Sequence, residues 1–104
     1  MQKEVVIVKD GDCVRAILPP DIDHHAAKGI RESIDLALCS LPRRILLDFS
    51  NVVFMDSSGI GLIIGRCEKA KRYGATVELV GVSADIMRII RICGIEKIKD
   101  LYIV

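Results

Sequence analysis

The stretch RILLDFSNVVFMDSSGIGLIIGRCEKAKRYGATVELV, residues 44–80, decides the fold. It begins with an apolar run over residues 44–49, which predicts a strand covered on both faces of a sheet. It ends with a second run, residues 76–80, that predicts another strand. A helical pattern lies between the two runs. Two strands joined through a helix are predicted to pair in parallel, with the helix as the crossover connection.

The crossover helix is predicted from about Ser58 to Tyr73. Apolar residues recur at helical spacing and form its predicted inner face: Ile60, Ile63, Ile64, Cys67 and Ala70. The basic residues Arg66, Lys69 and Arg72 are predicted to lie largely on the outer face. Gly74 follows at the position where a helix commonly ends on a left-handed residue.

The N-terminal part predicts a hairpin. Residues 5–9 and 13–18 are predicted strands, and the turn signal of residues 10–12 joins them. Pro19 and Pro20 end the second strand, because proline has no N–H to donate to a neighbouring strand.

A helix is predicted over residues 21–40, with Asp23 as its N-cap and Pro42 just after its end. Its predicted inner face consists of Ile30, Ile34, Ala37, Leu38 and Leu41. A third helix is predicted over residues 84–93, and a last strand over residues 97–103. The order β-β-α-β-α-β-α-β predicts a single α/β domain over residues 1–104.

Composition excludes several classes of protein. With 51% hydrophobic but only 4% aromatic residues, the core is predicted to be aliphatic. Fifteen basic residues against 14 acidic ones give a net charge of +1, which argues against a nucleic-acid-binding protein. The chain shows no signal-peptide pattern and no run of roughly 18 apolar residues, so a cytoplasmic protein without a membrane partner is expected.

The four cysteines are Cys13, Cys39, Cys67 and Cys93. No two of them have a spacing typical of metal ligands, so no zinc site is expected. Each lies in an apolar stretch, which predicts buried, reduced thiols rather than disulfides.

The segment Asp56-Ser57-Ser58-Gly59 is predicted to lie at the start of the crossover helix. The first amides of a helix have no partner within the helix and carry partial positive charge. A serine there either caps the helix or carries a phosphate, which accepts several amide hydrogen bonds. A phosphate on Ser57 would also lie beside the Asp56 carboxylate, so it would alter a binding surface more than it would stabilise the fold.

Three glycines follow at positions 59, 61 and 65, and each costs a helix interior about 1 kcal/mol relative to alanine. They indicate close approach to this helix, either by the sheet or by another protein. Their spacing differs from the dinucleotide-binding pattern, no P-loop lysine follows, and no nucleophile elbow surrounds Ser58, so no nucleotide cofactor or hydrolase is predicted.

The segment Asp21-Ile22-Asp23-His24-His25 contains potential metal ligands. Adjacent histidines on a helix point about 100° apart, so both rarely reach one ion, and no metal is expected. Two other interpretations of this segment stay open. It is either an exposed first helical turn capped by Asp23, or a contact with a partner protein through Asp23. A catalytic site that combines Ser57 with one of these histidines is a further hypothesis, but nothing in the sequence fixes the positions of these side chains relative to one another.

The run from Phe54 to Gly61, together with Asp23-His24-His25, resembles the anti-sigma factor antagonists of the STAS domain family. The resemblance extends from about Val5 to Ile98. It implies a STAS fold, in which a mixed central sheet has its helices mainly on one face. It also implies a phosphoprotein that regulates transcription through a sigma factor, as in sporulation, by partner switching.

In that mechanism the unphosphorylated antagonist binds an anti-sigma factor serine kinase and so releases the sigma factor. The kinase phosphorylates the first serine after the aspartate, here Ser57, and a PP2C-type phosphatase resets the cycle. The resemblance implies no catalytic residue, and it implies these partner-binding residues: Asp23, Asp56, Ser57, Ser58, Gly59, Ile60 and Gly61.

This sequence departs from the family pattern in two places. Pro20-Asp21 stands where relatives commonly have Gly-Glu, and the C-terminal helix of relatives is expected to be short or absent here, because the sequence ends at Val104. The alternative function is a STAS interaction module of a larger sensor or transport complex, without a phosphorylation cycle.

Overall fold

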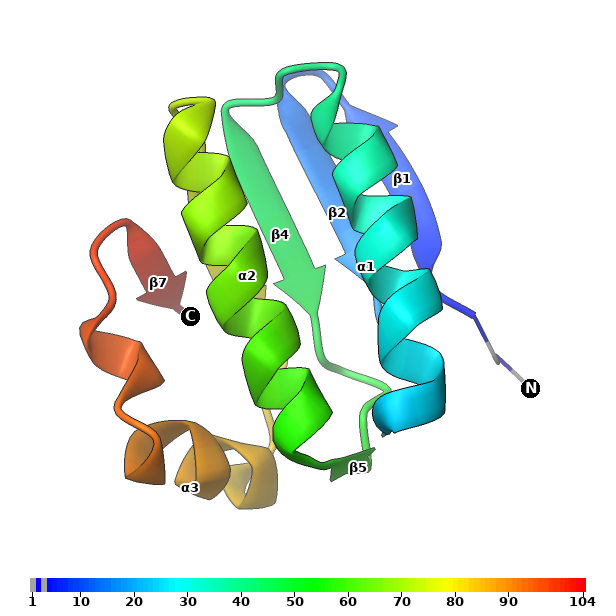
Figure 1. The fold of residues 1–104 in the computed structure, drawn as a ribbon, viewed down its shortest axis with the longest axis vertical. Helices are drawn as coiled ribbons and strands as arrows, with labels where there is room; N and C mark the ends of the chain where they lie inside the picture. Colours follow the sequence, from blue (N-terminus) through cyan, green and yellow to red (C-terminus); the bar gives the residue numbers. More distant parts are fainter. Residues whose placement is uncertain (1, 3) are drawn as a thin grey trace.

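A mixed five-stranded sheet forms the centre of the computed structural model, which describes residue 2 and residues 4–104 (Figure 1). In spatial order the strands are β1 (Val6–Asp10), β2 (Cys13–Ile17), β4 (Arg44–Asp48), β6 (Thr76–Val80) and β7 (Leu101–Ile103). β1 and β2 are antiparallel, and all other neighbours are parallel. The predicted crossover between β4 and β6 is therefore confirmed.

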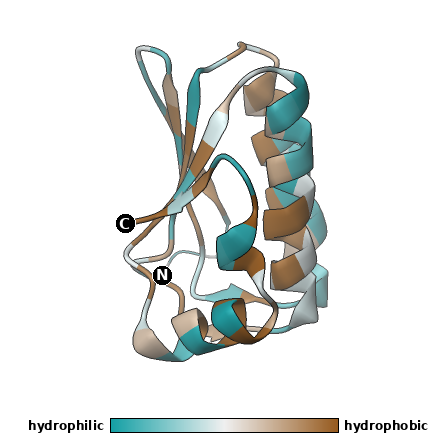
Figure 2. Cartoon of the chain, turned by 90° about the vertical axis from the view of Figure 1, so that its left-hand side faces the viewer, coloured by the Kyte–Doolittle hydropathy of each residue, from teal (hydrophilic) through white to brown (hydrophobic). Residues whose placement is uncertain are grey.

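The helices lie mainly on one face of this sheet, as predicted (Figures 1 and 2). α1 (His24–Leu38) and α2 (Ser57–Arg72) run side by side across that face, and α3 (Ala84–Ile92) lies at one end of it. A short 3₁₀ helix, η1 (Ile95–Lys97), precedes β7. No helix in the described part of the chain combines the length and apolar character that crossing a membrane requires.

The core lies between the sheet and the two long helices. Alternate residues of β4, such as Ile45 and Leu47, point toward the helices and are completely buried. The largest fully buried side chains are Phe49, Leu18, Ile22, Ile34, Leu38, Ile45, Leu47, Ile63, Leu79, Ile90, Ile95 and Val77. Each buried aliphatic side chain contributes about 1.5–3 kcal/mol, so this aliphatic layer holds the helices against the sheet.

The prediction that β4 is covered on both faces is wrong. Its residues Arg44 and Leu46 point away from the helices, Arg44 is exposed, and Leu46 is half-buried. That open face carries charged pairs instead of a second helical layer, including a hydrogen-bonded ion pair between Arg15 and Asp48. Ion pairing lets these groups occupy the sheet surface without a covering helix.

Two helix faces also differ from prediction. Arg66 is buried rather than outward-facing, because it lies between α1 and α2 and pairs with Asp35. Ile64, expected on the inner face, has a relative exposure of 37%, and Ile60 is half-buried. Leu41 is exposed because α1 has already ended at Leu38 and the chain turns there with a positive φ of 55°.

The thiols are free, but only Cys67 is buried, so the prediction of four buried cysteines is wrong. Cys39 and Cys93 are exposed because each is the C-cap of a helix, α1 and α3 respectively, where the chain reaches the surface. Cys13 is half-buried at the start of β2.

Two short strands were not predicted. β3 (Asp21–Ile22) and β5 (Phe54–Met55) form a separate parallel pair. Two residues are too few to show a periodic pattern, so the sequence predicts a helix at residue 21 and a connection over residues 51–54. The last strand, predicted over residues 97–103, is shorter in the structure, because Lys97 ends η1, residues 98–100 form a turn, and only Leu101–Ile103 pair with β6.

Candidate functional site

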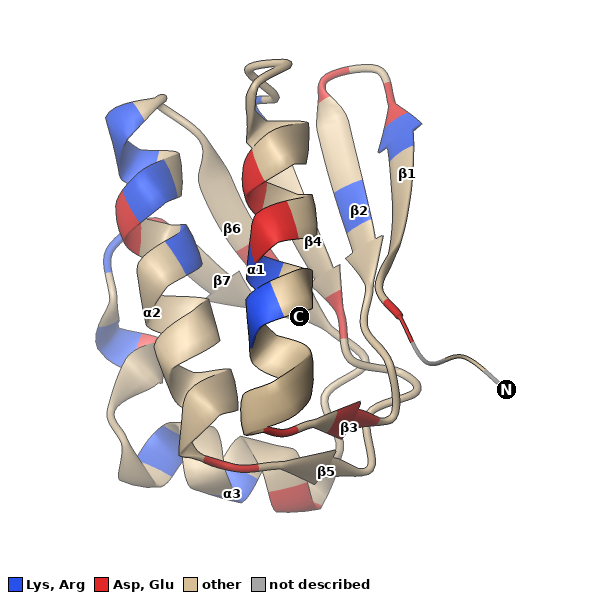
Figure 3. Ribbon diagram, turned by 45° about the vertical axis from the view of Figure 1, so that its right-hand side comes forward, with Lys and Arg blue, Asp and Glu red and all other residues tan. Residues whose placement is uncertain are grey.

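The β3–β5 pair places the starts of the two long helices next to each other. Asp21 lies opposite Phe54 and Ile22 opposite Met55, and each strand leads directly into a helix. Because parallel strands run in the same direction, the residues after them meet at one edge (Figure 3). The two segments that the sequence singled out, residues 21–25 and residues 56–61, are therefore neighbours.

An aspartate caps each helix at this edge. The Asp23 carboxylate accepts a hydrogen bond from the Ala26 amide at 2.8 Å, which confirms the predicted N-cap of α1. The Asp56 carboxylate accepts one from the Ser58 amide, also at 2.8 Å, and caps α2. Negative side chains at helix N-termini satisfy free amides and meet the positive end of the dipole.

Ser57 is the first residue of α2 and is exposed. Because Asp56 is the N-cap, the alternative in which the serines serve only as caps is wrong. No hydrogen bond of the Ser57 hydroxyl is found in the described part of the structure. The side chain is thus accessible and not required by the fold, whereas Ser58 is half-buried and faces α1.

The three glycines of α2 have different structural reasons. Gly59 is buried, and a Cβ at this position would collide with the Met55 side chain and approach Ile22. At Gly61 and Gly65 a Cβ would meet no described atom within 4 Å. Internal packing therefore explains Gly59 alone, and Gly61 presents a bare backbone on the exposed surface next to Ile60.

A groove of 560 Å³ separates the first turns of the two helices. We call it the α1–α2 groove, and its lining residues are His24, His25, Ala27, Lys28, Arg31, Ser58, Gly61 and Leu62. It joins both sequence motifs in one surface feature. It also includes Lys28 and Arg31, two exposed cations that the sequence reasoning did not select as site residues.

Two exposed apolar side chains border the site and were likewise missed. Val53 and Phe54 have relative exposures of 76% and 50%, immediately before Met55 and the Asp56 cap. Their signal in the sequence is an apolar pair placed in a predicted connection, where no strand or helix pattern explains it. Exposed apolar groups beside a polar motif are typical of a protein-binding surface.

In the described residues, the histidines and serines at this edge form neither a metal site nor a catalytic triad. The rings of His24 and His25 are 6.0 Å apart and meet edge to face. Within residues 2 and 4–104, no group of three or more histidine, cysteine, aspartate or glutamate residues is positioned to hold a metal ion. No hydrogen bond links Ser57 or Ser58 to a histidine side chain in the same residues.

Comparison with known proteins gives consistent family matches. Residues 5–102 match the model of the STAS domain. The anti-sigma F factor antagonist of Paenibacillus polymyxa is 31% identical over 86 residues, which cover 82% of this chain and 74% of that protein. The anti-sigma-B factor antagonist of Bacillus subtilis (strain 168) is 28% identical over 102 residues, which cover 97% and 92%.

Solved structures share the fold. The anti-sigma factor antagonist SpoIIAA in its unphosphorylated form matches with a TM-score of 0.76 at 24% identity, over 96% of this chain and 86% of that chain. The Bacillus cell fate determinant SpoIIAA in the phosphorylated form gives 0.75 at 24% identity, over 96% and 90%. An anti-sigma factor antagonist from Mycobacterium paratuberculosis gives 0.83 at 20% identity, over 94% and 83%.

Proposed function

Because this chain belongs to the STAS domain family, we propose that it is an anti-sigma factor antagonist controlled by reversible phosphorylation of Ser57. In this proposal the unphosphorylated protein binds an anti-sigma factor serine kinase and frees a sigma factor. Phosphorylation ends the complex, and a PP2C-type phosphatase restores the binding form. In this proposal the protein acts in the cytoplasm by binding, without catalysis of its own, and the process is sporulation, as the sequence resemblance implies.

The observation that carries this proposal is the state of Ser57. Its side chain is exposed at the first position of α2, and Asp56 already performs the capping task. A kinase can therefore reach the hydroxyl, and modification removes no hydrogen bond that the described structure shows. The backbone amides of a helix start also favour a phosphate group.

Electrostatics supports release of the partner rather than unfolding. A phosphoserine adds about −1.5 to −2 charges near neutral pH. Asp56 precedes Ser57 directly, and Asp23 lies on the neighbouring strand–helix unit. The helix dipole attracts the new charge while these carboxylates repel it, so the fold changes little and the surface potential changes strongly.

The proposed kinase-binding surface combines the polar and apolar features of this edge. It comprises Asp23, Asp56 and residues 57–61, with Val53 and Phe54 as apolar contacts. Gly61 would allow the kinase backbone to approach α2 closely, because no described side chain fills the space above it.

The test is incubation with ATP and the cognate anti-sigma factor serine kinase, followed by mass spectrometry. We expect one phosphate, located on Ser57. The Ser57→Ala variant should remain unmodified, while Ser58→Ala, a matched neighbour on the same turn, should still accept it. A phosphate retained in Ser57→Ala would contradict the proposal. A stable complex that never becomes phosphorylated would instead favour the STAS interaction module.

A further inference from the structure

The α1–α2 groove has an unusual distribution of charge. On α1, the basic residues occupy the first half of the helix and the acidic residues the second half (Figure 3). Lys28 and Arg31 line the groove, together with His24 and His25, and no aspartate or glutamate is among its lining residues. The lining of the groove therefore contains basic side chains without an acidic one, which favours a negatively charged ligand.

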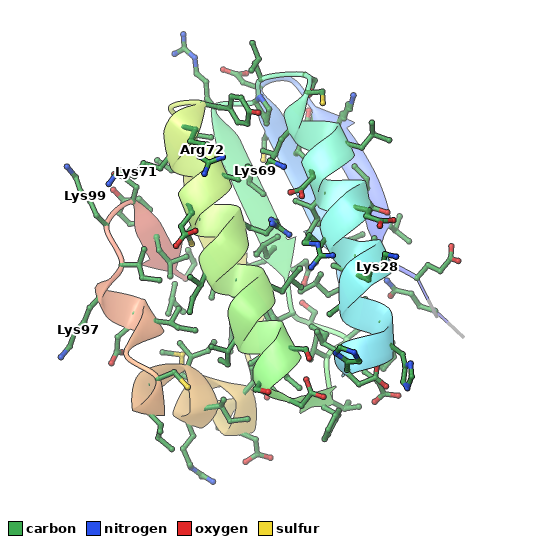
Figure 4. All side chains as sticks on the ribbon, in the orientation of Figure 1. Lys28, Lys69, Lys71, Arg72, Lys97 and Lys99 are labelled. Atoms are coloured by element: carbon green, nitrogen blue, oxygen red, sulfur yellow. The ribbon has the colours of Figure 1, made fainter. Side chains whose placement is uncertain are left out.

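The nearby carboxylate of Asp35 is already engaged by other cations. Asp35 pairs with Arg66 at 3.0 Å and with Lys69 at 3.3 Å. Lys69 reaches from α2 toward α1, as Figure 4 shows. No carboxylate lies within 4.0 Å of the Lys28 or Arg31 cationic group in the part of the chain that the structure describes. Both cations are thus available to a partner.

The remaining acidic residues of the two helices point elsewhere. Glu32 lines a separate groove with Glu4 and Leu36, away from α2. Glu68 lines another with Lys71 and Lys99, away from α1. No acidic side chain of α1 or α2 therefore lines the α1–α2 groove in the described residues.

Gly61 provides an independent sign that another chain approaches this groove. It lies in the groove wall, it is exposed, and the described fold needs no glycine there. A glycine in a helix interior costs about 1 kcal/mol relative to alanine. Its benefit is that a partner's backbone can approach the helix without meeting a side chain.

We propose that the α1–α2 groove receives an acidic segment of a protein partner, with its carboxylates paired to Lys28 and Arg31 and its backbone against Gly61. The inference deepens the proposed function, because the partner would be the serine kinase. It also gives a reason for release. Ser57 directly precedes Ser58 in the groove wall, so a phosphate on Ser57 would repel an acidic segment.

A nucleic acid fits these observations less well. The net charge of the chain is only +1, and the carboxylates of Asp23 and Asp56 lie at the same helix starts. A phosphate backbone that extends beyond the groove would meet these carboxylates. A short acidic peptide needs only the cations inside the groove.

The experiment is a titration of the ¹⁵N-labelled full chain with a hexaglutamate peptide at low ionic strength, followed by NMR. We expect saturable shifts of the amides of the groove residues. The double variant Lys28→Glu/Arg31→Glu should bind the peptide roughly tenfold more weakly. The matched control Lys97→Glu/Lys99→Glu makes the same change in net charge at a distant exposed site (Figure 4) and should bind like the unmodified chain.

Three results would overturn the inference: no saturable shifts, equal loss of affinity in both double variants, or tighter binding of a thymidine hexanucleotide at the groove. The NMR spectrum of each variant shows whether it is folded. The outcome is separable from that of the kinase assay. Phosphorylation of Ser57 without peptide binding would contradict only the proposal that the groove receives an acidic segment. Peptide binding without phosphorylation would contradict only the proposed phosphorylation cycle.

Discussion

Asp23 and Asp56 occupy the same position in two successive strand–helix units. Each directly follows a strand of the β3–β5 pair, and each accepts a hydrogen bond from the first turn of the helix that it caps. The two caps lock the starts of α1 and α2 without using Ser57. Helix capping and the proposed phosphorylation therefore use different side chains, so Ser57 can be changed without removing either cap.

Removal of the α2 cap should destabilise the protein. We expect Asp56→Ala to lower the free energy of unfolding by about 1 kcal/mol, because the Ser58 amide loses its acceptor. Asp56→Asn should retain most of the stability, since asparagine caps helices as well as aspartate does. Urea unfolding of the three proteins measures both effects. Equal losses in Ala and Asn variants would show that charge, not capping, is the stabilising property.

A negative charge at Ser57 should weaken the complex with the serine kinase. We expect Ser57→Asp to bind at least roughly tenfold more weakly, because the new carboxylate adjoins Asp56 and the partner contact. Ser57→Ala should bind like the unmodified chain, since the hydroxyl has no described hydrogen bond to lose. Calorimetric titration compares the three. Equal kinase affinities of Ser57→Asp and Ser57→Ala would contradict the proposal that negative charge at this position releases the kinase.

The glycines of α2 should respond in opposite ways. Gly59→Ala should destabilise the fold, because its Cβ would collide with Met55 and approach Ile22. Gly61→Ala should raise the free energy of unfolding by about 1 kcal/mol, because the site is open and alanine favours the helix. Thermal unfolding of the two variants and the unmodified protein measures both changes in stability.

The same Gly61→Ala variant should bind the kinase more weakly than the unmodified chain, in spite of its greater stability. Its Cβ would occupy the surface that we assign to the partner's backbone. Unchanged kinase binding by a stabilised Gly61→Ala protein would show that no chain approaches α2 at this point.

Removal of either residue of the Asp35–Arg66 ion pair should lower the free energy of unfolding, by an amount that depends on which residue is removed. Burial lowers the pKa of the Arg66 guanidinium, while Asp35 opposes that effect. Asp35→Ala leaves the buried cation unpaired, and we expect a loss of about 3 kcal/mol in unfolding free energy. Arg66→Met should lose less, because Lys69 still pairs with Asp35 and methionine fills the site. The opposite order in denaturant unfolding would contradict this account.

The cysteines should differ in reactivity. Burial raises the pKa of the Cys67 thiol to about 11, so the reactive thiolate is scarce in the folded protein. At pH 8, iodoacetamide should label exposed Cys39 and Cys93 first and spare Cys67 until the chain unfolds. Peptide mass spectrometry over time gives the order. Labelling of Cys67 in the folded protein as fast as Cys39 would disprove the burial.

Hydrophobic periodicity was sufficient to predict the long elements. The apolar positions of α1 and α2 repeat over several turns, and β4 and β6 are short segments rich in aliphatic residues, so their types and order follow from local patterns. The two-residue strands β3 and β5 carry no such pattern, and they were missed. Arg66 was misplaced for another reason: its burial depends on Asp35, 31 positions earlier in the sequence.

For the site, the sequence by itself identified Asp23 as a helix cap and the start of α2 as the segment that resembles the family motif. It also identified Ser57 as the candidate phosphorylation site. These are local properties, because a cap acts on amides two or three residues away. Only the tertiary structure decided that Asp56 frees Ser57 from capping, that Gly59 is needed for packing while Gly61 is not, and that Lys28 and Arg31 face Ser58. The close approach of Gly59 to Ile22 and the shared groove of Lys28, Arg31 and Ser58 depend on the parallel pairing of β3 with β5, which brings distant segments together and which no local pattern encodes.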